Sequence, residues 1–264
     1  MTDQGPQRAP VRRLAELILA SERTVALTGA GISVPSGIPD FRSPGSGLWE
    51  RVDPMEVAHI EVFRRDPERF WGFYGQRFQT LDDKRPNRAH EVLALLEGSG
   101  LLDAVVTQNI DGLHGGAGTR ELVEIHGTIA HSSCMRCGAS FALGDVRARQ
   151  AADEGGVPRC NCGEPLKPDV VLFGEYLPVE AFERALRLAE AADLMLCIGS
   201  SLEVYPVAEL PLRTLAGGGQ IAILTRGPTP LDGRAAVRLD GDVVDDLDAV
   251  ARELELTSAR PAPS

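Results

Sequence analysis

Residues 24–33 read Thr-Val-Ala-Leu-Thr-Gly-Ala-Gly-Ile-Ser, and the rest of the chain is organised around this stretch. Its first half, 24–28, is a short β-branched run of the kind that forms a buried strand. Gly29 and Gly31 then remove the Cβ atoms that would keep a backbone away from a bulky anionic ligand. A strand that runs into a Gly-x-Gly turn is the usual start of a nucleotide site, with amide N–H groups facing phosphate. By itself the pattern also fits a tight turn in any α/β protein, and Val34 stands where the third glycine of the dinucleotide fingerprint would be.

The segment after this turn carries an unusual set of side chains. Pro35 and Pro39 prevent a helix from running cleanly through it. Asp40, Phe41 and Arg42 follow, so that one acid, one aromatic and one base stand in the same loop. A loop that only connects two elements would not need these side chains, so we expect it to form an active-site lid.

Length and composition narrow the class of protein. At 264 residues the chain can hold one large domain or two unequal ones, and 43% apolar with 25% charged residues is ordinary for a globular protein. The net charge of −11 argues against direct nucleic-acid binding through phosphate neutralisation and is compatible with basic, lysine-bearing partners. No apolar run approaches the roughly 18 residues of a membrane span, so we expect no membrane association.

Strands and helices alternate along most of the chain. Strands are predicted at 24–28, 103–107, 122–125, 169–173, 193–198 and 220–224. Helices are predicted at 11–20, 67–80, 86–98, 178–191, 206–216 and 243–256. This alternation indicates a mainly parallel sheet covered on both faces, which binds ligands beyond the carboxyl ends of its strands. The positions that follow strands in this way are Gly31, Gln108, His126, Gly199 and Thr225.

Four of the five cysteines form two close pairs, Cys134 with Cys137 and Cys160 with Cys162. Four thiolates at this spacing predict a tetrahedral zinc ion, and a closed site of this kind is structural because no coordination position remains for substrate. The fifth, Cys197, lies inside an apolar strand and is expected in the core. The cysteines are spaced as metal ligands rather than as a disulfide framework, so we expect the protein in the reducing cytoplasm.

Several motifs occur in one order along residues 12–255, and together they resemble the sirtuin family. They are Gly29-Ala30-Gly31-Ile32-Ser33, Ile38-Pro39-Asp40-Phe41-Arg42, Thr107-Gln108-Asn109-Ile110-Asp111, His126-Gly127, the cysteine pairs, Phe173-Gly174-Glu175, Gly199-Ser200-Ser201 and Tyr205-Pro206. The resemblance implies an NAD-dependent protein-lysine deacylase of the α/β class. Its fold would be a Rossmann-like doubly wound parallel sheet with a smaller domain made of a helical insertion and a zinc ribbon. The larger domain would span 9–50, 86–127 and 165–256, the smaller one 51–85 and 128–164, with flexible tails at 1–8 and 257–264.

The resemblance also implies which residues bind each ligand. The co-substrate NAD would contact Gly29, Ala30, Gly31, Ser33, Asp40, Phe41, Arg42, Trp49, Gln108, Asn109, Ile110, Asp111, Gly199, Ser200, Ser201, Thr225, Arg226, Asp242 and Val243. An acyl-lysine protein or peptide would be clamped as an added strand by Val171, Phe173, Gly174 and Glu175 on one side and by Leu202 and Val204 on the other. The catalytic residues would be His126, Asn109 and Asp111.

In the mechanism of that family, the acyl-lysine amide oxygen attacks the ribose carbon from which nicotinamide leaves. Positive charge forms at this carbon, so acids and amides belong near it. A neutral imidazole, here His126, takes a proton from a ribose hydroxyl, a task that suits its pKa. The hydroxyl attacks the former amide carbon, and water then gives free lysine and O-acyl-ADP-ribose.

Two features bear on how closely the chain follows the family. Thr225 stands near the position where the family usually places an asparagine on the adenosine ribose, so a hydroxyl would replace only part of that contact. Tyr74 and Arg77 resemble the Tyr-x-x-Arg pair of the branch that removes succinyl and other acidic acyl groups, as does the segment 47–49. At i and i+3 on a helix they share a face and could grip a carboxylate. The alternative is an aromatic packing face with a solvated Arg77, so acetyl-lysine is the default substrate and succinyl-lysine a second possibility.

Other functions are open at this point. A protein mono-ADP-ribosyltransferase would use the same NAD site, a non-catalytic module would only sense NAD, and a dehydrogenase is the guess from fold class alone. The missing third glycine and the Asp-Phe-Arg loop count against the dehydrogenase. Among the other histidines, His90 is expected on a helix, and His114 and His131 at the surface or in a layer behind the site.

Overall fold

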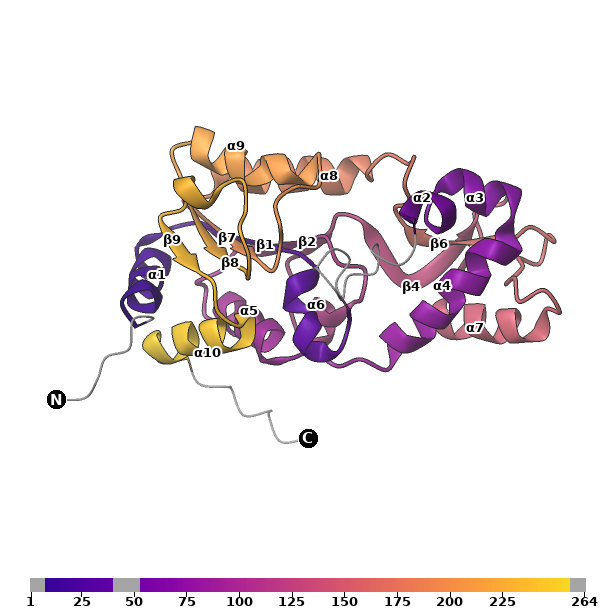
Figure 1. Cartoon of the computed structure of the whole chain (residues 1–264), viewed down its shortest axis with the longest axis horizontal. Coiled ribbons are helices and arrows are strands. Elements are labelled where there is room, and N and C mark those ends of the chain that lie inside the picture. Colours follow the sequence, from indigo (N-terminus) through magenta and orange to yellow (C-terminus); the bar gives the residue numbers. More distant parts are fainter. Residues whose placement is uncertain (1–7, 40–52, 257–264) are drawn as a thin grey trace.

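The computed structural model describes residues 8–39 and 53–256, and its larger sheet has six strands (Figure 1). In spatial order they are β3 (Leu122–Glu124), β2 (Ala104–Thr107), β1 (Thr24–Thr28), β7 (Leu194–Ile198), β8 (Gln220–Leu224) and β9 (Val237–Leu239). Every neighbouring pair is parallel, and Thr28 lies opposite both Thr107 and Ile198. The carboxyl ends of the strands therefore share one edge, and the predicted Rossmann-like sheet is confirmed.

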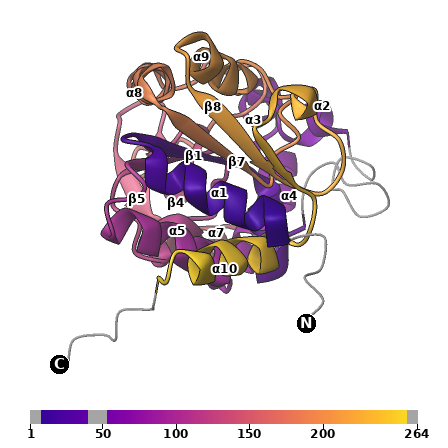
Figure 2. The same cartoon turned by 90° about the vertical axis from the view of Figure 1, so that its left-hand side faces the viewer.

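Helices cover both faces of this sheet (Figure 2). One face carries α1 (Arg8–Ala20), α5 (Arg88–Gly98) and α10 (Val243–Glu253), and the other carries α8 (Val179–Ala191) and α9 (Leu210–Ala216). Ala26 packs in the first of the two cores, whereas Val25 and Leu27 pack in the second. Successive strand side chains point to opposite faces, so a strand covered on both sides is apolar throughout.

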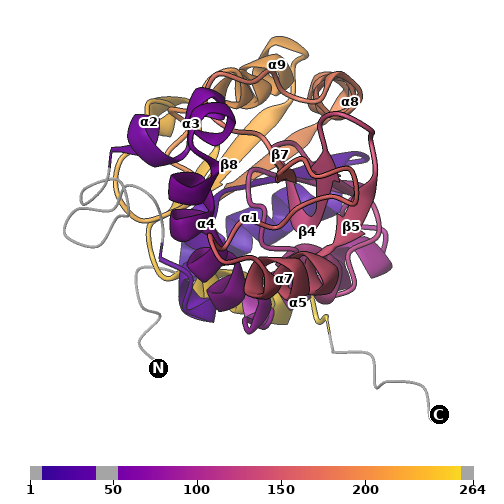
Figure 3. The same cartoon turned by 90° about the vertical axis from the view of Figure 1, so that its right-hand side faces the viewer.

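A second, three-stranded antiparallel sheet lies at the other end of the molecule, together with most of the remaining helices (Figure 3). Its elements are β5 (Ser140–Ala142), β4 (Gly127–Cys134), β6 (Leu166–Val170), α7 (Leu143–Ala152), α2 (Pro54–Val57), α3 (Ile60–Arg65) and α4 (Pro67–Asp82). They enclose a core of their own that includes Phe70, Trp71 and Leu166. The Trp71 indole N–H donates to the Leu166 carbonyl oxygen at 3.0 Å, so the helical insertion and the ribbon pack as one unit.

Short elements complete the chain. A one-turn helix, α6 (Leu113–Gly116), follows β2, and 3₁₀ turns lie at Ala30–Ile32, Val34–Ser36, Val207–Glu209 and Asp232–Arg234. Within the described ranges, no helix combines the length and apolar character that crossing a bilayer requires.

Two of the predicted helices begin where local capping chemistry places them. The Asp66 carboxylate accepts the Arg69 amide N–H at 3.0 Å, and Pro67 occupies the first turn of α4. At α5 the Asn87 side chain accepts the Ala89 amide, and the His90 ring accepts the Asn87 amide in a capping box. These bonds are local in sequence, which is why the starts could be predicted.

The segment predicted as a strand at 169–173 differs from the structure. The strand is β6, residues 166–170, and it pairs antiparallel with β4 in the smaller sheet rather than joining the parallel sheet. Leu166, Pro168 and Val170 are buried whereas the two residues between them are half-buried. This period of two is typical of an antiparallel strand with one covered face. The alternation of residues at 166–170 was therefore the sequence signal that could have placed β6 in an antiparallel sheet.

Other boundaries differ for equally local reasons. The helix predicted at 206–216 is a 3₁₀ turn followed by α9, with Pro211 in the first turn. The last helix ends at Glu253 rather than at 256, and Glu255 has a left-handed φ of 55°. β9 was not predicted, because three residues with Arg238 in the middle carry too little pattern.

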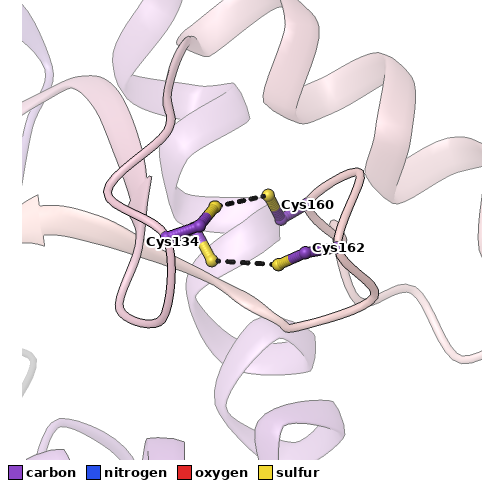
Figure 4. Close-up of side chains that lie close together, drawn as sticks. Cys134, Cys160 and Cys162 are labelled. Carbon is purple, nitrogen blue, oxygen red and sulfur yellow. Dashed lines mark hydrogen bonds between the residues drawn. The ribbon is translucent and has the colours of Figure 1, made fainter.

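The four paired cysteines gather where β4 ends and the chain approaches β6 (Figure 4). All four sulfurs lie within 4.8 Å of one another, and the closest pairs, Cys134 with Cys162 and Cys137 with Cys160, are 3.5 Å apart. Ligands about 2.3 Å from a tetrahedral zinc ion lie about 3.8 Å from each other, so the donor set fits zinc. Cys197 lies apart from the cluster, buried in β7.

We expect one bound zinc ion per chain, and we expect Cys134→Ser to lose it. Cys134 and Cys160 belong to the same core as Trp71, so loss of the metal should lower the free energy of unfolding by at least about 4 kcal/mol. Metal analysis gives the stoichiometry, and thermal unfolding followed by tryptophan fluorescence gives the stability. Cys197→Ala is the matched control and should keep its zinc. A Cys134→Ser chain with a full complement of zinc would contradict the assignment.

Candidate functional site

One large cavity, of about 1260 Å³, opens at the carboxyl ends of the parallel strands. Loops that follow strands of the larger sheet line one part of it, and α4 and the segment after β6 line another. Its walls include every described residue that the sequence assigned to NAD: Gly29, Ala30, Gly31, Ser33, Gln108, Asn109, Ile110, Asp111, Gly199, Ser200, Ser201, Thr225, Arg226, Asp242 and Val243. Asp40, Phe41, Arg42 and Trp49 lie outside the described residues.

The glycines of the first loop are required by a neighbouring loop. The Gly29 amide donates to the Ile198 carbonyl at 3.0 Å, and the Gly31 amide donates to the Gly199 carbonyl at 2.8 Å. A Cβ on Gly29 would lie 2.8 Å from the Gly199 oxygen, and one on Gly31 would lie 2.7 Å from the Gly199 Cα. The sequence explained these glycines by the approach of a ligand, whereas in the structure the loop after β7 already excludes a Cβ at both positions.

Three polar side chains on the floor of the cavity form one hydrogen-bonded group. The Ser33 hydroxyl donates to Asp111 Oδ2 at 2.7 Å. The Asn109 amide nitrogen donates to Ser33 Oγ and to the Gly29 carbonyl, both at 3.1 Å. The Leu113 amide holds the other Asp111 oxygen at 3.0 Å. Burial raises the pKa of Asp111, and the hydrogen bonds that its carboxylate accepts act in the opposite direction.

Two histidines form a layer behind this group. His90 Nε2 lies 3.5 Å from Ser33 Oγ, and His114 Nε2 lies 2.9 Å from Thr28 Oγ1. Burial lowers the pKa of His90 to about 4 and that of His114 to about 3, so both rings are neutral. His114 is thus in the layer behind the site and not at the surface, whereas His131 is exposed. No local sequence signal separates these two histidines, because the burial of His114 depends on β1 and α5.

The His126 ring has a defined tautomer. Its Nδ1 lies 3.0 Å from the Gln108 carbonyl oxygen, which can only accept, so Nδ1 carries the proton and Nε2 keeps its lone pair. Burial lowers the pKa of His126, and the bond to the Gln108 carbonyl opposes this shift. The Gln108 side chain turns the other way and donates to Ser200 Oγ at 2.9 Å. His126 is therefore a neutral hydrogen-bond acceptor at pH 7.

The segment assigned to substrate after β6 is held on both sides. The Val171 amide donates to the His126 carbonyl at 2.8 Å, and Phe173 exchanges backbone hydrogen bonds with Ala58 and Ile60. These bonds hold the segment in the cavity wall, where Phe173 forms an isolated bridge with His59 and Gly174 turns with a left-handed φ of 83°.

The Glu175 carboxylate is held by two neighbours close in sequence. Its Oε2 accepts the Leu172 amide and Lys167 Nζ, both at 2.9 Å. Lys167 also donates to the carbonyl oxygens of Pro168 and Val170. Lys167 was not identified from the sequence, because nothing local marks an ion pair that forms only when β6 and the following turn fold together.

The opposite wall carries residues 202–204, of which two contribute to the cavity. Val204 and Glu203 line it, whereas Leu202 is buried in the core beneath α8 and α9. Leu202 has a φ of 55°, and its amide donates to Ser200 Oγ at 3.3 Å. Any contact of Leu202 with a peptide would therefore use its backbone.

Tyr74 and Arg77 of α4 both line the cavity. Tyr74 stacks on Phe70 with ring centroids 4.7 Å apart, as a packing role requires, and the Arg77 guanidinium lies 5.8 Å from the Phe73 ring centre. Burial raises the pKa of Tyr74 to about 12, while the nearby Arg77 charge acts to lower it. The pair is thus both part of an aromatic cluster and part of the cavity wall.

At the far end of the cavity, Arg226 and Asp242 form an ion pair 3.0 Å long. The second Asp242 oxygen accepts the Val244 amide at 2.9 Å and caps α10. Thr225, which stands near the position where the family usually has an asparagine, is buried and also lines the cavity.

Known proteins are similar in sequence to this chain. A model of the Sir2 family matches residues 29–206 of the chain. An NAD-dependent protein deacetylase of Sulfolobus acidocaldarius is 50% identical over 221 residues, which cover 84% of this chain and 86% of the relative. An NAD-dependent protein deacetylase of Thermotoga maritima is 42% identical over 236 residues, covering 89% of this chain and 94% of the relative.

Solved structures share the fold as well. A Sir2 complex with a p53 peptide and NAD⁺ has a TM-score of 0.85 and 41% identity, covering 92% of this chain and 98% of that chain. A Sir2 variant with a deacetylated p53 peptide and 3′-O-acetyl-ADP-ribose has a TM-score of 0.89 and 40% identity, covering 94% of this chain and 99% of that chain. With the sequence matches, these structures confirm the predicted resemblance: the chain belongs to the Sir2, or sirtuin, family.

Proposed function

We propose that this chain is an NAD-dependent protein-lysine deacylase. It would convert NAD, an acyl-lysine and water into nicotinamide, O-acyl-ADP-ribose and free lysine. The observation that carries the proposal is the neutral His126 ring, whose Nε2 can accept a proton inside a cavity that also contains the glycine loop and the peptide-facing segments. The relatives named as NAD-dependent protein deacetylases support acetyl-lysine as the first substrate to test.

Different walls of the cavity would bind different parts of NAD. Amide N–H groups of the loops after β1 and β7 would bind the NAD diphosphate and the adenosine side, and Gln108 would bind the nicotinamide ribose. Asn109 and Asp111 would hold the nicotinamide end, where the Ser33 hydroxyl fixes the carboxylate. A carboxylate held there would also stabilise the positive charge that forms at the ribose carbon as nicotinamide leaves.

The acyl-lysine would enter between the segment after β6 and residues 203–204. Its amide oxygen would form the new bond to the ribose carbon, while the bond to nicotinamide breaks. His126 Nε2 would then take the proton of a ribose hydroxyl, whose oxygen attacks the former amide carbon. The Gln108 carbonyl helps because it fixes the Nδ1–H tautomer that leaves Nε2 free to act.

The first prediction from the proposed function concerns the products. With NAD and an acetyl-lysine peptide, mass spectrometry should show nicotinamide, O-acetyl-ADP-ribose and free lysine in equal amounts. His126→Ala should lower kcat about 10²- to 10⁴-fold, the usual contribution of a general base, while calorimetry still detects NAD binding. His131→Ala, at an exposed histidine, is the control and should keep full activity.

The same assay separates the alternatives. Transfer of radiolabel from NAD to protein without deacylated peptide would indicate an ADP-ribosyltransferase. Formation of NADH would indicate a dehydrogenase. Binding of NAD without release of nicotinamide would indicate a non-catalytic module, and each of these results would contradict a deacylase.

A second prediction concerns pH. Protonation of His126 occupies the lone pair of Nε2, so the ring can no longer act as a base. We therefore expect kcat/KM to fall as the pH drops through the pKa of His126. Because burial lowers that pKa, the acid limb should lie below the ordinary histidine value of about 6.5. Nicotinamide release measured from pH 5 to 9 gives the profile, with NAD binding over the same range as the control. An acid limb above pH 6.5 would contradict the proposed role of the buried ring.

A second candidate substrate is succinyl-lysine, favoured by the position of Tyr74 and Arg77 in the cavity wall. The Tyr74 hydroxyl is protonated at neutral pH, and burial moves its pKa further from neutrality, to about 12. A protonated phenol and a guanidinium on one helix face are both donors, and a carboxylate at the end of an acyl chain is an acceptor for both.

The third prediction tests this pair. Arg77→Met should lower kcat/KM for a succinyl-lysine peptide about tenfold or more, since a hydrogen bond to a charged group contributes about 1.5–3 kcal/mol. The value for the matched acetyl-lysine peptide should change about twofold or less. Arg69→Met, at an exposed arginine of α4 paired with Glu56, is the control. Undiminished desuccinylation in Arg77→Met would contradict the proposal that Tyr74 and Arg77 bind the succinyl carboxylate.

The compartment belongs to the same proposal. All five cysteines are free, and four of them form a thiolate cluster suited to metal. Such a cluster persists where thiols are kept reduced, so we place the protein in the cytoplasm.

A further inference from the structure

The peptide-facing part of the cavity has an uneven distribution of charge. Three carboxylates line it, on Glu175, Glu183 and Glu203. Among the lining residues in the described ranges, the arginines and lysines are Arg77, beside Tyr74 on α4, and Arg226, paired with Asp242 at the opposite end. A peptide that enters between the two clamp segments, residues 171–175 and 202–204, therefore meets acidic side chains.

Two of these carboxylates are available to a partner. Glu175 is already bound by Lys167 and by the Leu172 amide. Glu183, on the first turns of α8, is exposed and makes only a long ion pair of 3.7 Å with Arg187. Glu203 is exposed, and none of the arginines and lysines that the structure describes lies within ion-pair distance of it. Glu203 is thus the stronger anchor for a cation, and Glu183 the second.

Two exposed aromatic rings also line this cavity. Tyr176 follows the first clamp segment and is 97% exposed, and Tyr205 follows the second and is 67% exposed. Both line the cavity. An exposed tyrosine ring attracts a guanidinium or ammonium group to its face, so rings and carboxylates favour the same kind of side chain.

We propose that Glu203 and Glu183, together with Tyr176 and Tyr205, select acyl-lysines that stand in a basic stretch of extended peptide, with arginine or lysine beside the modified residue. The inference rests on the proposed deacylase function and adds the class of protein segment that it acts on. The net charge of −11 acts in the same direction, because it raises the rate of encounter with basic segments at low salt.

The test compares three acetyl-lysine peptides of equal length, with arginine, glutamine or glutamate on both sides of the modified residue. The expected order of kcat/KM is arginine, then glutamine, then glutamate. The ratio between the first and last should be about two- to twenty-five-fold at low salt, because each of two exposed ion pairs contributes a factor of about 1.4 to 5. In about 0.5 M salt the ratio should fall toward one, since screening weakens exposed charges.

Variants assign the preference to residues. Glu203→Gln should reduce the arginine-to-glutamate ratio about threefold, and Glu203→Arg should bring it below one. Glu180→Gln is the matched control, because Glu180 is an exposed acid of α8 that does not line the cavity, and the ratio should be unchanged.

The possible outcomes test the selection of basic segments separately from the proposed deacylase function. Equal kcat/KM for all three peptides, with free lysine formed from each, would overturn the selection of basic segments and leave the deacylase intact. An unchanged ratio in Glu203→Gln and Glu203→Arg would likewise overturn it. Release of free lysine from none of the peptides would overturn the deacylase, and the inference with it.

Discussion

The close contact between the turn after β1 and the loop after β7 is the constraint on which the site depends. β1 and β7 are neighbours in the parallel sheet, so their carboxyl ends bring Gly31 and Gly199 together with no space for a Cβ. The same contact fixes the Gly29 carbonyl, which holds the Asn109 amide, and Asn109 in turn bonds Ser33. The position of the cavity floor is therefore set by backbone packing before any ligand binds.

The smaller sheet contributes to the site through the chain itself. β4 begins at Gly127, directly after His126, and ends at Cys134 in the metal cluster. Gly127 packs so closely on the Asp169 carbonyl that a Cβ would clash with it, and the Val171 amide bonds the His126 carbonyl. A zinc ion that stabilises this ribbon would thus also stabilise His126, the proposed base, and the segment after β6, the proposed peptide-binding edge, without taking part in the chemistry.

Burial sets the protonation state of the groups around the reaction centre. It lowers the pKa of His126, His90 and His114, so three rings stay neutral in the region where the proposed mechanism places positive charge on the ribose. It raises the pKa of Asp111, but the Ser33 and Leu113 hydrogen bonds favour the carboxylate. Neutral imidazoles with an acid nearby form an environment in which a developing cation is the best-stabilised charge.

The sequence by itself determined the parallel sheet, its helices, the metal cluster and the order of the motifs, because strand periodicity, helix caps and cysteine spacing are local properties. It could not place β6 in the second sheet or bury His114, because both depend on segments far apart in the chain. It could not pair Glu175 with Lys167 either, because that ion pair forms only when β6 and the following turn fold together. Only the tertiary structure decided which His126 nitrogen is free and which acids line the cavity. A hydrogen bond to the Gln108 carbonyl and an exposed Glu203 exist only once distant loops have packed around one cavity.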